Sequence, residues 1–304
     1  MSTIYQHRSQ IATDRFRELQ QLLHVAGDAQ NLLQPEQLTM RLNLLDELDA
    51  LMGDLDPDLL ITCPDSGLLA CAGALRRQLE SANQTLYQAV HAEIALRGGS
   101  PTLDRWLLDA KEVEAELLHP GLGFDLLDEI VCGVLQLHEP GEPGLLPSAE
   151  MTYYQPTPAR HILDLVATCR LSSDDIFVDL GSGLGHVPLL VNILTGNRTL
   201  GVEVQQDYAA SAQQTAQRLN LSGVRFVAED ARITDLSSGT VFYLFTPFTG
   251  SILTEVLHRL HQESKTRPIR VCGLGPSTRI MHEQTWLRTN QQPDTERITT
   301  FGSV

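Results

Sequence analysis

Apolar residues over the first 138 positions recur with the spacing of helices. Leu38, Leu42, Leu45 and Leu48 form one such stripe, and residues 126–137 carry another. The stripes are rich in Leu and Ala and contain few β-branched residues, which favours helix over strand. We therefore predict an N-terminal all-helical domain over residues 1–140, which would recognise a partner or cap a substrate site.

The pattern changes after a stretch rich in Pro and Gly, which predicts a linker at residues 141–150. Beyond it, short β-branched or aromatic runs alternate with amphipathic stretches of helical length. This alternation predicts an α/β domain over residues 151–304, built on a parallel sheet with helices on both faces. The predicted strands are Ile176–Leu180, Thr199–Val204, Val224–Ala228, Val241–Phe245 and Ile269–Gly273, the predicted helices are 188–194, 206–219 and 251–261, and two last strands are expected within 285–289 and 297–304.

The net charge of −16 is concentrated in the first half of the chain. Residues 1–150 hold 24 Asp and Glu against 9 Lys and Arg, whereas residues 151–304 hold 14 against 13. Direct binding to nucleic acid needs clustered basic residues, so we do not expect it. The acidic half suits a cationic substrate or a basic protein partner, and a merely solubilising surface is an equally good interpretation.

The five cysteines, at positions 63, 71, 132, 169 and 272, form no Cys-x-x-Cys pair. This scatter disfavours both a disulfide framework and a zinc site, and it predicts buried free thiols in a reducing compartment. The N-terminus lacks the apolar core of a signal peptide, and no apolar stretch is long enough to span a membrane. We therefore expect a cytoplasmic location without membrane attachment. The sequence indicates no oligomeric state.

The most informative motif is the loop Asp179-Leu180-Gly181-Ser182-Gly183-Leu184-Gly185, between a predicted strand and a predicted helix. Its glycines let the backbone turn tightly and approach a ligand. In open α/β sheets, ligands bind beyond the carboxyl ends of the strands. We therefore predict a ligand site at this loop.

Two further acids lie at the ends of the next two predicted strands. Glu203 can accept both ribose hydroxyls of an adenosine, and Asp230, followed by Ala231, can accept a hydrogen bond from the adenine amino group. Each acid alone is as well explained by loop capping. With Asp179 they form a constellation that favours a nucleoside ligand.

The spacing of the loop distinguishes between nucleosides. Its third glycine comes one residue earlier than in a dinucleotide fingerprint, and the carboxylate of Asp179 would repel a pyrophosphate. The loop resembles that of the class I S-adenosylmethionine-dependent methyltransferases. The resemblance covers residues 150–304 and implies a Rossmann-like, seven-stranded sheet whose last strand is antiparallel. It also implies S-adenosyl-L-methionine as the cofactor, bound by Asp179, Gly181, Ser182, Gly183, Gly185, Glu203, Asp230 and Ala231.

A segment ahead of the loop, Tyr153-Tyr154-Gln155-Pro156-Thr157-Pro158, resembles the lid of the lysine methyltransferases that lack the SET fold. That resemblance implies that Thr157 contacts the cofactor and that Tyr154 lies near the transferred methyl. A simpler interpretation is that Thr157 caps a helix whose first residue is Pro158.

The fourth predicted strand ends in Phe245-Thr246-Pro247-Phe248. Amino-directed methyltransferases carry Asn/Asp-Pro-Pro-Tyr/Phe there, so Thr246 is a departure that disfavours methylation of a nucleobase. We place Thr246 with Tyr154 as candidate catalytic residues, and Phe248 and His186 as candidates for substrate contact. Phe248 as a core aromatic and His186 as a residue of the first helical turn are the plain alternatives.

These observations predict an S-adenosylmethionine-dependent methyltransferase that acts on a protein amine, such as lysine. An alternative is an enzyme for a small molecule, with the helical domain as a cap. Another is a nucleoside-binding interaction protein without activity, although the complete loop and both acids argue against it. A hydride-transfer enzyme is a lesser alternative. No metal is predicted.

Overall fold

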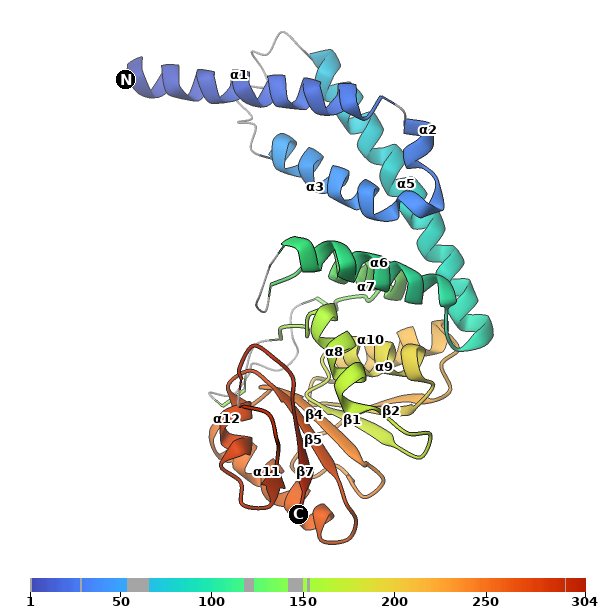
Figure 1. Ribbon diagram of the computed structural model, residues 1–304, viewed down its shortest axis with the longest axis vertical. Coiled ribbons are helices and arrows are strands. Elements are labelled where there is room, and N and C mark those ends of the chain that lie inside the picture. The colour runs from blue at the N-terminus through green and yellow to red at the C-terminus, as the bar shows by residue number, and fades with distance from the viewer. Residues whose placement is uncertain are drawn as a thin grey trace. The chain divides into compact units, whose positions relative to one another are not determined.

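The computed structural model divides the chain into two compact units, residues 1–89 and 90–304. It describes residues 2–27, 29–53, 66–117, 123–141, 150–151, 154–292 and 294–304. The limit between the units falls inside helix α5 (Ser66–Arg97), well before the predicted linker (Figure 1). Residues 142–149 of that linker lie outside the described residues.

The first unit is helical, as the leucine stripes predicted. It comprises α1 (Ser2–Val25), α2 (Ala29–Leu32), the 3-10 helix η1 (Pro35–Gln37), α3 (Leu38–Gly53) and the first part of α5. Leu19, Leu44, Leu48 and Leu79 are buried together in its core. Among them Arg41 is fully buried, and its guanidinium donates to Asn83 Oδ1 at 2.7 Å.

The second unit combines helices with one sheet of seven strands, in the order β3-β2-β1-β4-β5-β7-β6. Strands β1 to β5 run parallel, and β7 is antiparallel to both neighbours, as the resemblance implied. The first five strands begin and end within one residue of their predicted limits. The strands are β1 (Ile176–Leu180), β2 (Arg198–Glu203), β3 (Val224–Ala228), β4 (Val241–Phe245), β5 (Arg270–Leu274), β6 (Leu287–Arg288) and β7 (Thr299–Ser303).

Helices cover both faces of this sheet (Figure 1). Because side chains alternate along a strand, Val178 and Leu180 face one side, where they pack against Leu253 and Val256 of α11. Phe177 faces the other side and stacks on Tyr243. The helices of this unit beyond α5 are α6 (Pro101–Leu117), α7 (Leu126–Leu135), α8 (Ala159–Cys169), α9 (His186–Thr195), α10 (Gln206–Arg218), α11 (Gly250–Ser264) and α12 (Ser277–His282).

Helix α7 supplies the cap of helix α8. Asp128 Oδ1 accepts the backbone N–H of Ala159 at 2.7 Å, and Arg160 forms an ion pair with Asp125 at 2.6 Å. The N-cap position of α8 is Pro158, without a side-chain cap. The interpretation of Thr157 as the helix cap is therefore wrong, because an aspartate from a distant helix satisfies the first amide.

The described residues contain no helix that is long and apolar enough to cross a membrane. Cys169 and Cys272 are buried as predicted, whereas Cys71 and Cys132 are exposed on helices α5 and α7, so the prediction of buried thiols is wrong for them. Cys63 lies outside the described residues. In the part of the chain that the structure describes, no three His, Cys, Asp or Glu side chains cluster to hold a metal.

Candidate active site

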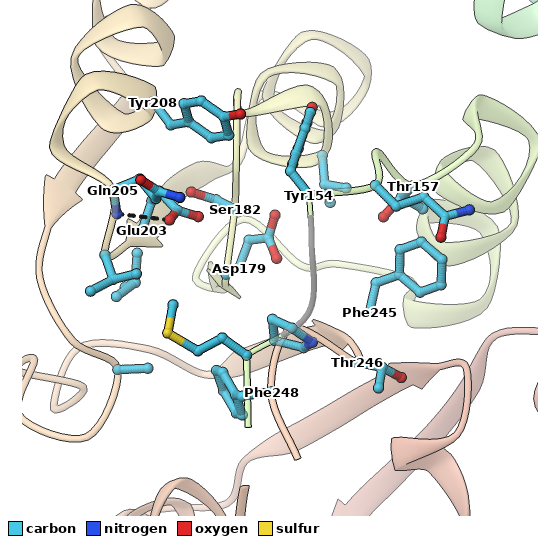
Figure 2. A pocket seen from close by; sticks show the side chains of 18 of the residues that line it. Tyr154, Thr157, Asp179, Ser182, Glu203, Gln205, Tyr208, Phe245, Thr246 and Phe248 are labelled. Atoms are coloured by element: carbon cyan, nitrogen blue, oxygen red, sulfur yellow. Dashed lines mark hydrogen bonds between the residues drawn. The ribbon is translucent and has the colours of Figure 1, made fainter. Parts of the chain in front are cut away.

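A cavity of about 680 Å³ opens where the parallel strands β1, β2 and β4 end (Figure 2). It lies at the edge of the sheet that the sequence predicted. Gly183 and Gly185 shape the loop but do not line the cavity. The predicted residues that do line it are Tyr154, Thr157, Asp179, Gly181, Ser182, His186, Glu203, Asp230, Ala231, Thr246 and Phe248.

The glycine-rich loop admits no side chain at two positions. A Cβ at Gly181 would lie 2.2 Å from Pro247, and a Cβ at Gly183 would lie 2.1 Å from the ring of Tyr154. Both glycines also have positive φ, +88° and +52°, which L side chains rarely adopt. The loop therefore brings the Tyr154 ring directly against the backbone at Gly183.

Tyr154 also bonds to the first residue of α9, because its hydroxyl lies 3.0 Å from Nδ1 of His186. Burial raises the pKa of Tyr154 well above its ordinary range and lowers the pKa of His186 to about 4. At neutral pH the phenol therefore donates and the neutral imidazole accepts. The imidazole proton then sits on Nε2, which lies 3.8 Å from the sulfur of Cys132.

Two buried carboxyl groups face the cavity. Glu203 accepts the backbone N–H of Gly183 on Oε2 at 2.9 Å. Its Oε1 accepts the backbone N–H of Gln205, also at 2.9 Å (Figure 2). Burial raises the pKa of Asp179 well above its usual range, and the charge of Glu203 adds to this rise. Burial also raises the pKa of Glu203, against the bonds from the two amides. A cationic ligand would relieve both groups.

S-adenosylmethionine fits the acidic side chains of this cavity. It carries a positive sulfonium and an ammonium group, which complement Asp179 and Glu203. The hydroxyl of Ser182 is buried in the cavity wall without a partner among the described residues, so it is available to a polar ligand. Asp179, Ser182 and Glu203 are the residues of this chain that would hold the polar parts of the cofactor.

Asp230 lies at the cavity edge and is held by Arg232. Arg232 Nη2 lies 2.7 Å from Asp230 Oδ2, and its backbone N–H donates to Oδ1 at 2.8 Å. These bonds lower the pKa of Asp230, first through the hydrogen bonds from the Arg232 side chain. An adenine amino group at Asp230 would therefore share the carboxylate with Arg232.

In the turn after β4, the hydroxyl of Thr246 bonds to Leu274 and Ser277 and not to the glycine-rich loop. Thr246 has φ +42°, and its Oγ1 donates to the Leu274 carbonyl at 3.1 Å and lies 3.2 Å from Ser277 Oγ. Phe248 is buried and forms a β-bridge with Met151. Thr157 is bonded elsewhere, with its hydroxyl 3.1 Å from that of Tyr243.

Sequence reasoning missed several residues that line the cavity, among them the polar side chains of Glu139, Gln205, Tyr208 and Arg232. Gln205 and Tyr208 follow the strand-two acid closely and could have been proposed from that position. Glu139 carried no such signal, because it lies in the segment that was predicted to end the helical domain. Its charge, after burial, raises the pKa of Tyr208, which packs edge-on against Tyr154 with ring centres 5.3 Å apart.

Residues 149–236 match the family model described as histone methylation protein DOT1. No curated protein matches the chain. An RNA methyltransferase from Salinibacter ruber, solved with S-adenosyl-L-homocysteine, is 22% identical over 49% of this chain and 92% of its own, with a TM-score of 0.41. A human methyltransferase 10 domain containing protein is 17% identical over 59% of this chain and 94% of its own, with a TM-score of 0.39.

The DOT1 match spans the Tyr154 segment, the glycine-rich loop and the three acids. It therefore covers the same residues whose geometry fits a cationic nucleoside. The seven strands and the antiparallel β7 are what the resemblance implied. The chain is a class I S-adenosylmethionine-dependent methyltransferase.

Proposed function

We propose that this enzyme N-methylates lysine side chains of a basic protein. The observation that carries the proposal is the composition of the cavity wall near the β4 turn. Met151, Phe245, Pro247, Phe248 and Ile252 make that wall apolar. Such a wall suits the four methylene groups of a lysine better than the polar edge of a nucleobase.

The charge of the cavity supports a cationic acceptor. Glu139 and Glu229 line it in addition to the three predicted acids, against the single guanidinium of Arg232. A lysine that approaches is attracted as an ammonium group, and it must lose a proton before its nitrogen can attack. Desolvation against the apolar wall lowers the pKa of an amine and favours the neutral form.

The residues of this chain act mainly by positioning. S-adenosylmethionine, when bound, supplies a methyl group that is already activated on sulfur, so alignment provides much of the catalysis. We propose that Tyr154 closes the cofactor side against Gly183 and that Phe248 borders the acceptor side. Thr246, predicted to be catalytic, would act as a positioning residue, because its hydroxyl holds the turn to Leu274 and Ser277.

The DOT1 match agrees in substrate class, since its description names histone methylation. The acidic first half of the chain agrees as well, because its balance of −15 would attract a basic protein. We propose that the predicted helical domain, residues 1–140, contributes to recognising that protein. A cytoplasmic location remains part of the proposal.

The test is transfer of radiolabelled methyl from S-adenosylmethionine by the full chain to histones, with lysine-acetylated histones as matched acceptors. We expect label on protein, released as methyllysine after hydrolysis, and none on the acetylated sample. The Gly183→Ala variant serves as the control without cofactor binding. Label on acetylated histones or only on small molecules of a cell extract would overturn the lysine proposal, and label nowhere would overturn any transferase activity.

A further inference from the structure

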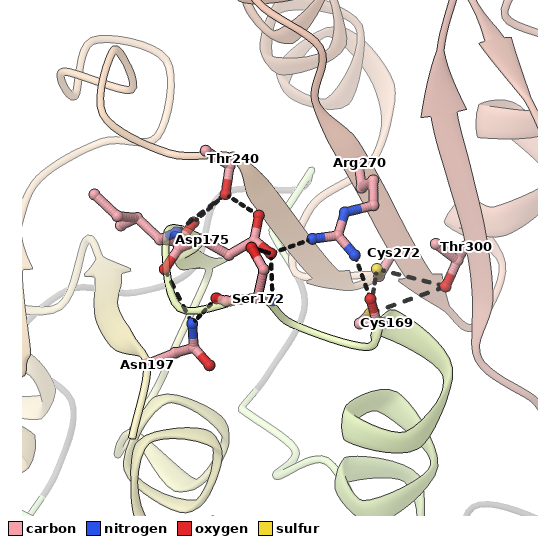
Figure 3. Close-up of polar contacts among 9 residues, drawn as sticks. Cys169, Ser172, Asp175, Asn197, Thr240, Arg270, Cys272 and Thr300 are labelled. Atoms are coloured by element: carbon pink, nitrogen blue, oxygen red, sulfur yellow. Dashed lines mark hydrogen bonds and ion pairs between the residues drawn. The ribbon is translucent and has the colours of Figure 1, made fainter. Parts of the chain in front are cut away.

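Two cysteines that are far apart in the sequence meet inside the second unit, away from the cavity. Cys169 is the last residue of α8 and Cys272 lies in the middle of β5. Their sulfur atoms are 3.0 Å apart (Figure 3). Both residues are buried, with 3% and 0% of their surface exposed, and neither lines the cavity.

A polar cluster fixes the end of α8 against β5. Arg270 donates to the Cys169 carbonyl oxygen, and its Nη2 lies 2.6 Å from Asp175 Oδ2 (Figure 3). Asp175 in turn accepts from Ser172 N–H at 2.7 Å and from the Thr240 hydroxyl at 2.8 Å. The two sulfur atoms are therefore held together by contacts that do not involve the thiols.

The two thiols are chemically unequal. The hydrogen bond between them lowers the pKa of Cys169, and the nearby Thr300 hydroxyl and Arg270 charge act in the same direction. The same bond and burial raise the pKa of Cys272. Because the thiolate is the reactive form, Cys169 is the expected nucleophile and Cys272 the resolving thiol.

We propose that Cys169 and Cys272 are a peroxide-sensitive pair that forms a reversible disulfide. Sulfur atoms 3.0 Å apart need to approach by only about 1 Å to reach the bond length of about 2.05 Å. The pair also meets a requirement that isolated cysteines do not, since the resolving thiol already touches the nucleophile.

The reaction proceeds in two steps. The Cys169 thiolate attacks one oxygen of hydrogen peroxide, the O–O bond breaks, and the sulfenic acid and hydroxide form. The Cys272 sulfur then attacks Cys169 and displaces hydroxide, which takes the Cys272 proton and leaves as water. The hydroxide from the first step takes up the proton that the Cys169 thiol released when it ionised. In sum, two thiols lose two electrons, and one peroxide is reduced to two waters.

The bond would close a loop of about one hundred residues that contains β1 to β4. A cross-link of that size restricts the unfolded chain strongly, so we expect the melting temperature to rise by roughly 5–10 °C. Because the pair lies outside the cavity, the dissociation constant of S-adenosylhomocysteine should change less than about twofold.

The experiment treats the full, reduced chain with hydrogen peroxide, blocks the remaining thiols with iodoacetamide and maps the products by non-reducing mass spectrometry. We expect a peptide cross-linked between positions 169 and 272, a loss of two of the five thiols, and reversal by dithiothreitol. The Cys272→Ser variant should stop at sulfenic acid on Cys169, whereas the exposed-site control Cys132→Ser should still form the bond.

The cross-linked peptide is sought in the wild-type chain, so the test does not depend on whether the variants fold. Oxidation confined to Cys71 and Cys132 would overturn the proposal. Cross-links only between chains, or a cross-linked peptide that dithiothreitol fails to release, would do the same.

Discussion

The hydroxyl of Tyr154 lies 3.0 Å from Nδ1 of His186, and the ring of the same tyrosine covers Gly183. One side chain therefore fastens the segment ahead of α8 both to the glycine-rich loop and to the helix that follows the loop. Because His186 is neutral above a pH of about 4, its Nδ1 accepts the hydrogen bond from Tyr154 throughout the physiological pH range.

Replacing Tyr154 by Phe keeps the ring on Gly183 and removes the bond to His186. We expect S-adenosylhomocysteine to bind more weakly by about 0.5–1.5 kcal/mol, the usual net value of one hydrogen bond. Isothermal calorimetry measures this. Thr240→Val is the matched control, since it removes the hydroxyl bond to Asp175, and neither residue lines the cavity. Equal losses of affinity in both variants would contradict the specific role of Tyr154.

Substituting Ala at Gly183 should abolish measurable cofactor binding in a folded protein. The new Cβ would lie 2.1 Å from the Tyr154 ring, so the ring must leave its place. Gly196→Ala is the control, because Gly196 also has positive φ, +73°, but has no neighbour within 4 Å. Both variants should lose about 1–2 kcal/mol of stability through the left-handed backbone. If Gly183→Ala still bound the cofactor normally, Tyr154 could not be part of the site.

The variant Asp179→Asn should separate affinity from stability. Loss of the charge should weaken cofactor binding by about 1–3 kcal/mol, as for Glu203→Gln. The same change should leave the melting temperature of the ligand-free protein unchanged or higher, since a buried charge beside Glu203 is removed. Glu283→Gln, at an exposed position on the end of α12, should alter neither quantity. An unchanged affinity in a folded Asp179→Asn protein would remove this carboxylate from the site.

The free energy of unfolding of the ligand-free protein should fall as the pH rises, because the carboxyl groups of Asp179 and Glu203 lose their protons. The pKa values of Asp179 and Glu203 are raised in the folded state above the unfolded values of about 3.9 and 4.3. Their contribution is therefore complete below pH 4 and is lost as pH rises through the folded pKa values. A cationic cofactor should lower both pKa values and release protons on binding.

Melting curves with and without S-adenosylmethionine between pH 5 and pH 8 measure this effect. The dissociation constant of the ligand should fall as the pH rises. When the ligand concentration is kept at a fixed multiple of the dissociation constant, the stabilisation by the ligand should be the same at every pH. Calorimetry in buffers of different ionisation enthalpy should show proton release. Proton uptake would contradict the assignment of the carboxyl groups.

The sequence was sufficient for the sheet because periodicity and turn residues are local. Strands β1 to β5 and the loop at Asp179 follow from alternation and glycine spacing alone. The cap of α8 could not be predicted in this way, because Asp128 lies 31 positions before the amide that it accepts. Likewise, nothing local to Thr157 indicates that its hydroxyl bonds to Tyr243.

The missed residues of the site have the same physical cause. Glu139 reaches the cavity because His138 and Gln136, just before it, accept bonds from Ser211 and Arg218 of α10. Such contacts between distant segments produce no periodic pattern of apolar and polar residues in the sequence. Arg232 is different, since its two-residue spacing from Asp230 is local, and the pattern Asp-x-Arg could have predicted their ion pair.

The cap that α7 gives to α8 limits how this enzyme can be shortened. A fragment that starts at Glu150 would lack Asp128 and Asp125, leaving the Ala159 amide and the Arg160 guanidinium without these partners. It would also lack Glu139 from the cavity. We expect that fragment to be expressed as insoluble protein, whereas a chain that begins at Val90 should fold and bind S-adenosylhomocysteine. The smallest autonomous catalytic piece of this protein is thus set by a helix that carries none of its sequence motifs.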